Sequence, residues 1–271
     1  MPVADEPLER WVLPDKRSAL EWCRERNSGQ IRGVLDPLGQ YAHRPAEAIR
    51  STRAYAALAK AIEQNTLKAS LAVKLTTLGA VFDRELCRRN LISLSGAGAR
   101  RRIRVEIDME GKGLVDFTLH SAIECAGEGF PITVALQAYL DRTPADLERA
   151  LQKGLRVRLV KGTYMGDASD HGEVQRRLRA LATRASESGL PFSIGTHDPE
   201  MIEWARTLPV EKGRLEFGFL KGLSDRTKQS LAHQGWPVAE YVPFGQESEA
   251  YVQRRLNYLR SLELLGKGPA P

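Results

Sequence analysis

Regular alternation between short apolar segments and longer amphipathic segments constrains the fold of this chain more than any other feature. Eight segments rich in Val, Ile and Leu are typical of strands, at 30–36, 70–74, 103–108, 132–136, 156–160, 192–194, 214–217 and 238–242. Each is followed by a segment with the apolar spacing of a helix, at 45–63, 81–91, 116–126, 144–152, 173–188, 199–206, 225–233 and 247–265. Eight such units predict parallel strands with right-handed crossovers, closed into a (β/α)8 barrel of the α/β class.

The same pattern predicts one barrel domain with a short addition at each end. Residues 1–29 form an N-terminal extension with a helix at 16–26, residues 30–265 form the barrel, and residues 266–271 form a flexible tail. An open doubly wound sheet is the alternative, but no Gly-x-Gly-x-x-Gly sequence follows any predicted strand.

Charge and composition narrow the class of protein. The net charge of +6 would suit nucleic acid, an anionic ligand or an anionic membrane surface. Nucleic acid is disfavoured because the cations are interleaved with 34 acidic residues and the only dense basic run is 100–102. Three widely spaced cysteines, no apolar run of membrane-spanning length and no signal-peptide pattern favour a reduced cytoplasmic protein.

Polar residues stand at or near the ends of most predicted strands. In a (β/α)8 barrel, the loops that follow the strands form the catalytic face. Buried ionisable groups are costly unless they are paired, so their recurrence predicts a polar cavity with charges of both signs. For Asp36 and Asp198, capping of the following helix is an equally good interpretation. The residues concerned are Asp36, Lys74, Asp108, Gln137, Arg158, Lys161, Thr196, His197, Asp198 and Tyr241.

These residue types favour some chemistries over others. The five histidines include no i, i+4 pair, so no metal site is predicted, and no Gly-x-Ser-x-Gly sequence suggests a serine nucleophile. Several cations, an amide and a phenol suit an anionic substrate and an electron-rich cofactor. Two alternatives stay open: a lyase that uses Lys74 or Lys161 as a Schiff-base amine, and a barrel without catalytic activity that acts as a binding module.

Nine segments, in order, resemble the proline dehydrogenase family. They cover about residues 30–256 and read LDPLGQ (35–40), VKLTTLG (73–79), EIDMEG (106–111), LQAYLDRT (136–143), RVRLVKGTY (156–164), GTHD (195–198), LEFGFLKG (215–222), YVPFG (241–245) and YVQRRL (251–256). The resemblance implies a distorted (β/α)8 barrel that holds a flavin. It also implies oxidation of L-proline to Δ1-pyrroline-5-carboxylate by hydride transfer to flavin N5, with a quinone as the electron acceptor.

The resemblance also implies a role for each matching substrate residue. Lys74, Arg254 and Arg255 would form ion pairs with the substrate carboxylate, because the last helix of the family lies over the barrel mouth. Leu220 and Tyr241 would pack on the substrate ring. Asp108 would lie beside the pocket and orient Lys74 or Tyr241.

A second set of matching positions implies contacts with the flavin. Arg158 would lie near N5 and Gln137 would bond the edge of the isoalloxazine ring. The ribityl, phosphate and adenine parts would lie along Lys161, Gly162, Thr196 and His197.

The chain departs from the family pattern on the adenine side and in the outer pocket. Met165 replaces a usual Trp, Gly218 and Lys221 stand where Gln and Tyr are common, Gln40 replaces Glu, and Asn257 with Tyr258 follows the arginine pair. We therefore expect FAD with FMN as the alternative, and L-proline with hydroxyproline or another cyclic imino acid as the alternative. A quinone acceptor also raises the expectation of peripheral contact with the inner face of the cell membrane.

Overall fold

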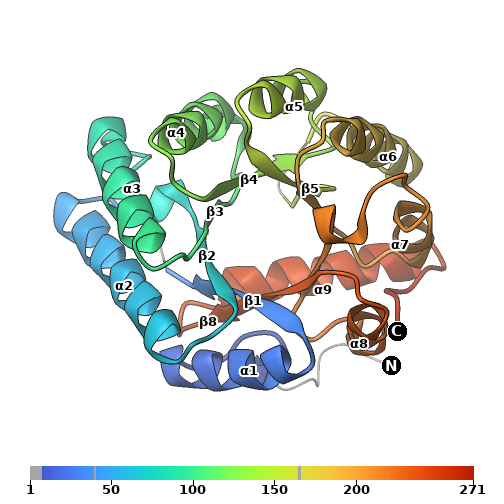
Figure 1. The fold of residues 1–271 in the computed structure, drawn as a ribbon, viewed down its shortest axis with the longest axis horizontal. Helices are drawn as coiled ribbons and strands as arrows, with labels where there is room; N and C mark the ends of the chain where they lie inside the picture. Colours follow the sequence, from blue (N-terminus) through green and yellow to red (C-terminus); the bar gives the residue numbers. More distant parts are fainter. Residues whose placement is uncertain (1–7, 40, 164–165) are drawn as a thin grey trace.

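Eight parallel strands form a closed barrel in this computed structural model, which describes residues 8–39, 41–163 and 166–271. Each strand pairs with the next along the chain, and β8 pairs with β1 to close the ring (Figure 1). The strands are β1 (Ile31–Pro37), β2 (Ala69–Val73), β3 (Val105–Ile107), β4 (Ile132–Gln137), β5 (Arg156–Val160), β6 (Phe192–Gly195), β7 (Leu215–Leu220) and β8 (Val238–Phe244).

Helices surround the barrel and bury their apolar faces against the strands. Short 3-10 helices lie at Leu8–Arg10, Leu75–Leu78, Lys112–Leu114 and Lys212–Arg214. The α-helices of the described residues are α1 (Lys16–Ser28), α2 (Pro45–Gln64), α3 (Arg84–Ala99), α4 (Val115–Gly127), α5 (Thr143–Gln152), α6 (His171–Glu187), α7 (Pro199–Ala205), α8 (Asp225–His233) and α9 (Glu249–Leu264).

The predicted (β/α)8 barrel is confirmed, and the differences are local. Strands β7 and β8 extend beyond the predicted segments 214–217 and 238–242. Gly218 to Leu220 of β7 pair in register with Ala239 to Tyr241 of β8. Asp198 caps α7 as expected, by accepting a hydrogen bond from the amide of Met201. The Thr143-Pro144 sequence is typical of a helix start with Thr as the cap, but the Thr143 side chain does not cap α5. Its hydroxyl donates to the carbonyl of Gln137 at 2.6 Å and so ties α5 to the end of β4.

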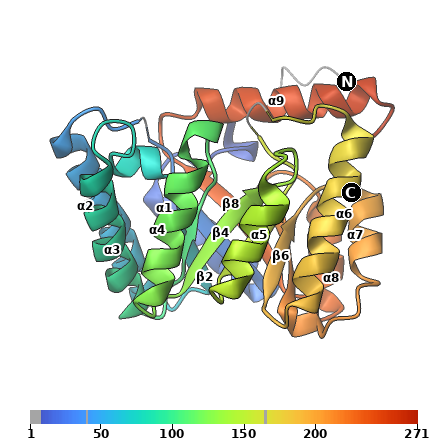
Figure 2. The ribbon, with the colours of Figure 1, turned by 90° about the horizontal axis from the view of Figure 1, so that it is seen from above.

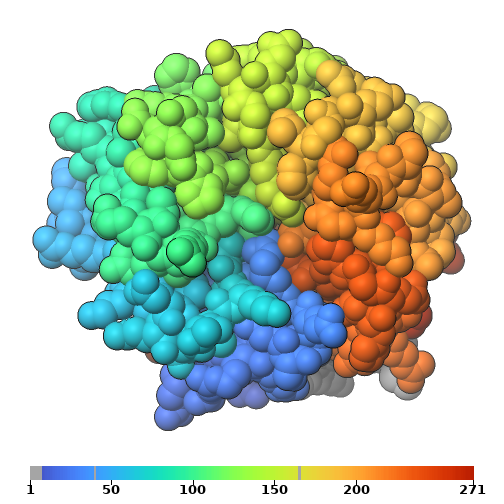
Figure 3. All heavy atoms as spheres, in the orientation of Figure 1, coloured from blue at the N-terminus to red at the C-terminus, as the bar shows by residue number. Residues whose placement is uncertain are grey.

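Helix α1 fills the place in the outer ring that an eighth helix would otherwise take. It lies between α2 and α8 and packs on β1, where the buried Cys23 fits against Gly33 (Figure 1). A Cβ atom at Gly33 would lie 2.5 Å from the sulfur of Cys23, so this close approach requires glycine. Helix α9 lies instead across the carboxyl ends of the strands (Figure 2). Figure 3 shows the opposite face, where side chains of the successive strand–helix units close around the barrel.

One buried carboxylate, Glu240, joins α1 and α8 to β8. Ala239 and Tyr241 face the inside of the barrel, so the alternation of the strand directs Glu240 outward. Its oxygens accept from Trp22 Nε1 at 2.6 Å and from Arg26 Nε at 3.2 Å, and it forms an ion pair with Lys228. Glu240 and Lys228 have no exposed side-chain surface. This ionic contact, rather than apolar packing alone, fixes α1 in the ring.

The carboxyl-terminal segment 266–271, expected to be a flexible tail, makes contacts at its end. Ala270 is buried, and its amide donates to the carbonyl of His197 at 2.7 Å. The amide of Thr227 donates to the carbonyl of Pro271 at 2.7 Å. In the described part of the chain, no helix combines the length and the apolar composition that a membrane span requires.

Replacing Lys228 with Met should destabilise the fold strongly, because Glu240 would lose its fully buried cationic partner. Removing one partner of a buried ion pair typically costs about 3–5 kcal/mol. Urea unfolding of the Lys228→Met variant should show a loss of this size. The exposed Lys60 offers a matched control, and Lys60→Met should leave the midpoint nearly unchanged. Equal stability of the two variants would contradict the role given to the Glu240 contact.

Candidate active site

A cavity of about 460 Å³ opens at the carboxyl ends of the strands, beneath α9. Residues from seven strands, from the segments that follow the strands, and from α9 line it, so that positions far apart in the sequence meet at one place. Asp36 and Asp198 of the strand-end residues do not line this cavity. Each residue to which the family resemblance gives a role does line it: Lys74, Asp108, Gln137, Arg158, Lys161, Gly162, Thr196, His197, Leu220, Tyr241, Arg254 and Arg255.

The floor of the cavity is ionic, unlike the branched aliphatic interior common in this fold. Alternation along the strands directs charged residues inward at successive levels, and their ion pairs form a continuous network. The network runs from Arg156 through Glu216, Arg32, Glu106, Arg158, Asp108 and Lys74 to Asp36. Its four carboxylates equal its four cations in number, so each buried charge is compensated.

Lys74 is the most tightly held cation of the upper level. Its Nζ donates to both carboxylate oxygens of Asp36, at 2.8 and 2.7 Å, and lies 3.3 Å from Asp108 Oδ2. It also donates to the hydroxyl of Tyr241 at 3.0 Å, while that hydroxyl donates to Asp108 Oδ2 at 2.6 Å. Asp108 therefore contacts both Lys74 and Tyr241, the two candidates that the family resemblance gives for it to orient.

The electrostatics keep Lys74 and Tyr241 protonated. Burial alone would lower the pKa of Lys74, but Asp36, Tyr241 and Asp108 raise it well above its usual value. Burial and the two carboxylates raise the pKa of the Tyr241 phenol well above 10. A Schiff-base amine needs a lowered pKa, so the Lys74 version of the lyase alternative has no support.

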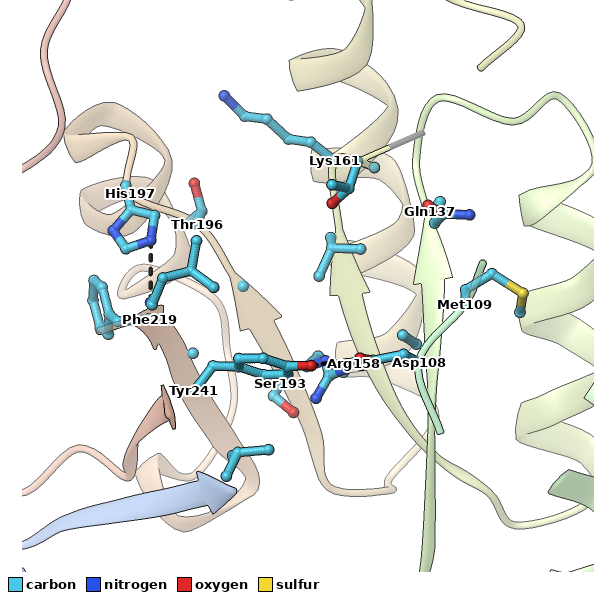
Figure 4. Close-up of a pocket in the computed structure, with 18 of the residues that line it drawn as sticks. Asp108, Met109, Gln137, Arg158, Lys161, Ser193, Thr196, His197, Phe219 and Tyr241 are labelled. Atoms are coloured by element: carbon cyan, nitrogen blue, oxygen red, sulfur yellow. Dashed lines mark hydrogen bonds and ion pairs between the residues drawn. The ribbon is translucent and has the colours of Figure 1, made fainter. Parts of the chain in front are cut away.

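Arg158 lies between two carboxylates of β3. Its Nη1 lies 2.8 Å from Glu106 Oε2, and its Nη2 forms an ion pair with Asp108. Figure 4 shows the Tyr241 hydroxyl directed toward Arg158 and Asp108, and Asp108 accepts its hydrogen bond. Burial would raise the pKa of Asp108, but Lys74 and Arg158 lower it, so this carboxylate stays ionised.

Helix α9 carries the paired arginines over the cavity. Arg254 and Arg255 are both partly buried, and the guanidinium of Arg255 lies 4.8 Å from the ring centre of Tyr251, one turn earlier. Tyr251 is 5% exposed, and its hydroxyl has no hydrogen-bond partner within the residues described. Adjacent arginines reach one cavity because the helix lies across its opening.

The wall formed by β4 and β5 holds an amide and a glycine. Gln137 Nε2 donates to the carbonyl of Glu110 at 3.2 Å, and its Oε1 accepts from the hydroxyl of Tyr139 at 2.8 Å. Gly162 has a φ of +126°, and a Cβ there would lie 1.7 Å from the Tyr139 ring. Only glycine allows the chain to turn at this point without displacing the ring.

Lys161 offers a buried cation that is incompletely satisfied. Among the described residues its Nζ has no hydrogen-bond partner, and it lies 3.8 Å from Asp198 Oδ2. Burial lowers its pKa, with Asp198 opposing the shift. An unbonded ammonium beside the cavity is chemically suited to an anionic group such as a phosphate.

Thr196 and His197 follow β6 and have internal partners. Thr196 Oγ1 accepts from the amide of Asp198 at 3.1 Å. The Leu220 amide donates to His197 Nε2 at 3.2 Å, and His197 Nδ1 lies 3.0 Å from Ser224 Oγ (Figure 4). Burial, and then the nearby Arg255, lower the pKa of His197 well below 6.5. A neutral ring with an acceptor at Nε2 carries its proton at Nδ1, so His197 fixes the position of Leu220.

The departures from the family pattern differ in their consequences. Lys221 is directed away from the cavity: its Nζ donates to the carbonyl of Arg10 at 3.0 Å and lies 4.2 Å from the ring centre of Trp22. Gly218 lies in the cavity lining opposite Gly195 of β6, where it leaves space that a larger side chain would fill. Met165 and Gln40 lie outside the described residues.

Several residues of the site were not predicted from the sequence. Asp36 was interpreted as equally well a helix cap, although its place two residues after the inward-facing Val34 indicates that it points inward. The same period of two would have indicated Arg32, Glu106 and Glu216. Tyr251 lies one helical turn before the arginine pair, which is the spacing of neighbours on one helix face. No group of three or more His, Cys, Asp or Glu within the described residues is placed to hold a metal ion.

The sequence of this chain is similar to those of proteins with known names. The family model of proline dehydrogenase matches residues 19–188. Proline dehydrogenase 2 of Bacillus subtilis (strain 168) is 27% identical over 250 residues, which cover 89% of this chain and 82% of that protein. Proline dehydrogenase of Deinococcus radiodurans is 28% identical over 269 residues, covering 92% of this chain and 84% of that protein.

Solved structures show the same fold. Proline utilization A (PutA) from Bdellovibrio bacteriovorus, inactivated by N-propargylglycine, superposes with a TM-score of 0.85 and 19% identity over 92% of this chain. A PutA variant from Bradyrhizobium japonicum superposes with a TM-score of 0.79 and 20% identity, also over 92%. This chain spans only 32% and 30% of those two longer chains.

The buried neutral His197 should make stability depend on pH in a defined window. Its pKa is lower in the folded state, so the unfolded chain binds the extra proton as the pH falls below about 6.5, and stability is lost. One such proton costs about 1 kcal/mol between pH 6.5 and 5.5. Urea unfolding at these two values should show a smaller loss in His197→Gln than in the wild type. The exposed His233 is the control, and His233→Gln should lose as much stability between the two pH values as the wild type. An equally large loss of stability in His197→Gln would refute this assignment.

Proposed function

This chain belongs to the proline dehydrogenase family and functions in the oxidation of proline in proline catabolism; on that basis we propose that its mouth cavity holds L-proline beside a bound flavin. The reaction forms Δ1-pyrroline-5-carboxylate. The observation that carries the proposal is the convergence of Lys74, Arg254 and Arg255 on one cavity that Arg158 also lines.

The substrate carboxylate is the group that this cavity recognises. Lys74 supplies a permanent positive charge because Asp36 and Asp108 keep it protonated. Arg254 and Arg255 add charge from the opposite side, on α9, and guanidinium groups bind carboxylates with defined orientation. Leu220 and Tyr241 supply apolar surface for a small saturated ring. The hydroxyl of Tyr241 donates a hydrogen bond to Asp108, so its ring stays fixed as the substrate enters.

The cavity residues fit a flavin. The family is flavin-dependent, and a bound flavin accepts a hydride from the carbon beside the ring nitrogen of proline and is reoxidised by a quinone. Arg158 and Gln137 would hold the isoalloxazine ring, with Arg158 favouring negative charge on it. The incompletely satisfied Lys161 suits a phosphate, and Gly162 allows close approach of the backbone. We propose FAD as the flavin, with FMN as the alternative.

Thr196 and His197 line the side of the cavity where we propose that the flavin binds, and they contribute to it in different ways. Thr196 presents its side chain at the cavity edge. Both ring nitrogens of His197 have partners inside the protein, so it contributes ring surface and holds Leu220 against the substrate.

We also propose that the protein works in the cytoplasm, with peripheral contact at the inner face of the membrane where quinones dissolve. Two features support this proposal. All three cysteines are buried and unpaired. Ile49, Val81 and Phe82 are exposed apolar side chains on the mouth side of the barrel, where the flavin would be reoxidised.

Purified protein should contain flavin, and anaerobic addition of L-proline should bleach its absorbance near the visible flavin maximum. The acid-released cofactor then distinguishes FAD from FMN. Titration with hydroxyproline and a six-membered cyclic imino acid in parallel tests the ring that the Gly218 space accepts. Protein that binds neither flavin, or whose flavin is not reduced by any of these substrates, would overturn the proposal.

Replacing Arg254 or Arg255 with Ala should raise the KM for proline while flavin content stays constant. Loss of a charged partner of the substrate costs about 2 kcal/mol or more, which corresponds to roughly 30-fold. Arg260, exposed on the same helix, is the matched control. Steady-state kinetics with wild-type KM in both arginine variants would exclude them from carboxylate recognition.

A further inference from the structure

The lower level of the ionic floor contains a carboxylate that the proposed function does not yet use. Glu106 is 1% exposed and lies two residues before Asp108 on β3, one level further from the mouth. It accepts from the hydroxyl of Ser70 at 2.6 Å and lies 2.9 Å from Arg32 Nη1 and 2.8 Å from Arg158 Nη1. Residues of three other strands, β1, β2 and β5, therefore contact this one side chain.

We infer that Glu106 is a positioning residue, which anchors the guanidinium of Arg158 to the floor, offsets its charge and thereby sets the reduction potential of the flavin. The inference rests on the proposed function. It adds a residue that touches Arg158 from below, on the side away from the mouth.

The anchoring follows from the hydrogen-bond geometry. Arg158 is held between Asp108, nearer the mouth, and Glu106, nearer the floor. Glu106 uses one oxygen for Arg158 and the other for Ser70 and Arg32, all of which present hydrogen atoms. Both oxygens of a carboxylate accept hydrogen bonds, so Glu106 can bind donors on both sides. A glutamine has one accepting oxygen, and its NH2 group can only donate. Loss of Glu106 would therefore free Arg158 to move toward the mouth.

Loss of the negative charge of Glu106 would affect the flavin in the same direction as movement of Arg158 toward the mouth. The ion-paired cations and carboxylates of the floor are equal in number, Arg104 adds a further cation nearby, and Asp108 divides its charge between Arg158 and Lys74. Without Glu106 the floor carries one more uncompensated positive charge close to Arg158. Positive potential stabilises the reduced, anionic form of a flavin, so the potential should rise. At a few ångströms in a protein interior, one unit charge changes an equilibrium by about tenfold or more.

The test compares two glutamate variants that remove the same charge at different places. Glu216 is also buried in the floor, but it contacts Arg32 and Arg156 instead of Arg158. Sulfite adds to flavin N5 and binds more tightly when the electrostatic potential around the flavin is more positive. Glu106→Gln should therefore lower the dissociation constant of sulfite by about tenfold. A tenfold change in the equilibrium of a two-electron couple corresponds to about 30 mV. Glu216→Gln should change the sulfite constant less than about threefold.

A second variant covers the case in which Glu106→Gln does not fold. Glu106→Asp keeps the charge but withdraws it from Arg158 by one methylene, and it should lower the sulfite constant by about threefold. Potentials measured with reference dyes must rise in the variants whose sulfite dissociation constants fall. Thermal unfolding of each variant is recorded alongside, because a purely structural role would lower stability without moving the potential.

The outcomes separate the inference from the proposed function. Wild-type sulfite affinity in the folded Glu106 variants, or an equal shift in Glu216→Gln, would overturn the inference while wild-type protein still binds flavin and oxidises proline. Wild-type protein without bound flavin would instead overturn the proposed function.

Discussion

Pairing of buried charges inside the barrel is the interaction on which the rest of this structure depends. Eight ionisable side chains fill levels that aliphatic residues usually occupy, and each would be costly to bury alone. The network is stable because strands brought together by barrel closure supply opposite charges at contact distance, such as Arg32 of β1 with Glu106 of β3 and Glu216 of β7. Its upper end lines the proposed substrate site, so the same contacts that hold the interior together fix Lys74 and Arg158 in position.

The arrangement of the helices follows from a second ionic contact. Glu240 binds Trp22 and Arg26 of α1 and Lys228 of α8, and this places α1 in the ring position next to β1 and β8. The helix after β8 is then not needed there and lies across the mouth (Figure 2). The position of α9 brings Arg254 and Arg255 above Lys74, so a contact on the outside of the barrel determines the geometry of the cavity inside it.

The period of the apolar residues and the strand-end rule were sufficient to predict the fold and eight residues of the cavity lining, whereas Gly162, Leu220, Arg254 and Arg255 were indicated only by the resemblance to proline dehydrogenases. These two rules did not predict which side chains pair with one another. Asp36 and Lys74 are separated by a whole helix, and their pairing depends on the register of β1 and β2. Lys221 shows the limit most clearly: it follows β7 like a site residue, yet one step of the alternation directs it outward to Arg10 and Trp22. Contacts with the N-terminal segment decided its position, and no local pattern contains that information.

The central claim is that the mouth cavity recognises a carboxylate by charge. The most direct measurement is a titration of the flavin-containing protein with cyclopentanecarboxylate and with cyclopentanecarboxamide, a neutral ligand of nearly the same shape. Neither contains the ring nitrogen beside the carbon that is oxidised, so absorbance changes report binding alone. The carboxylate should bind at least about tenfold more tightly and compete with proline, since Lys74 and two arginines face it. Equal affinity of the two ligands would contradict it.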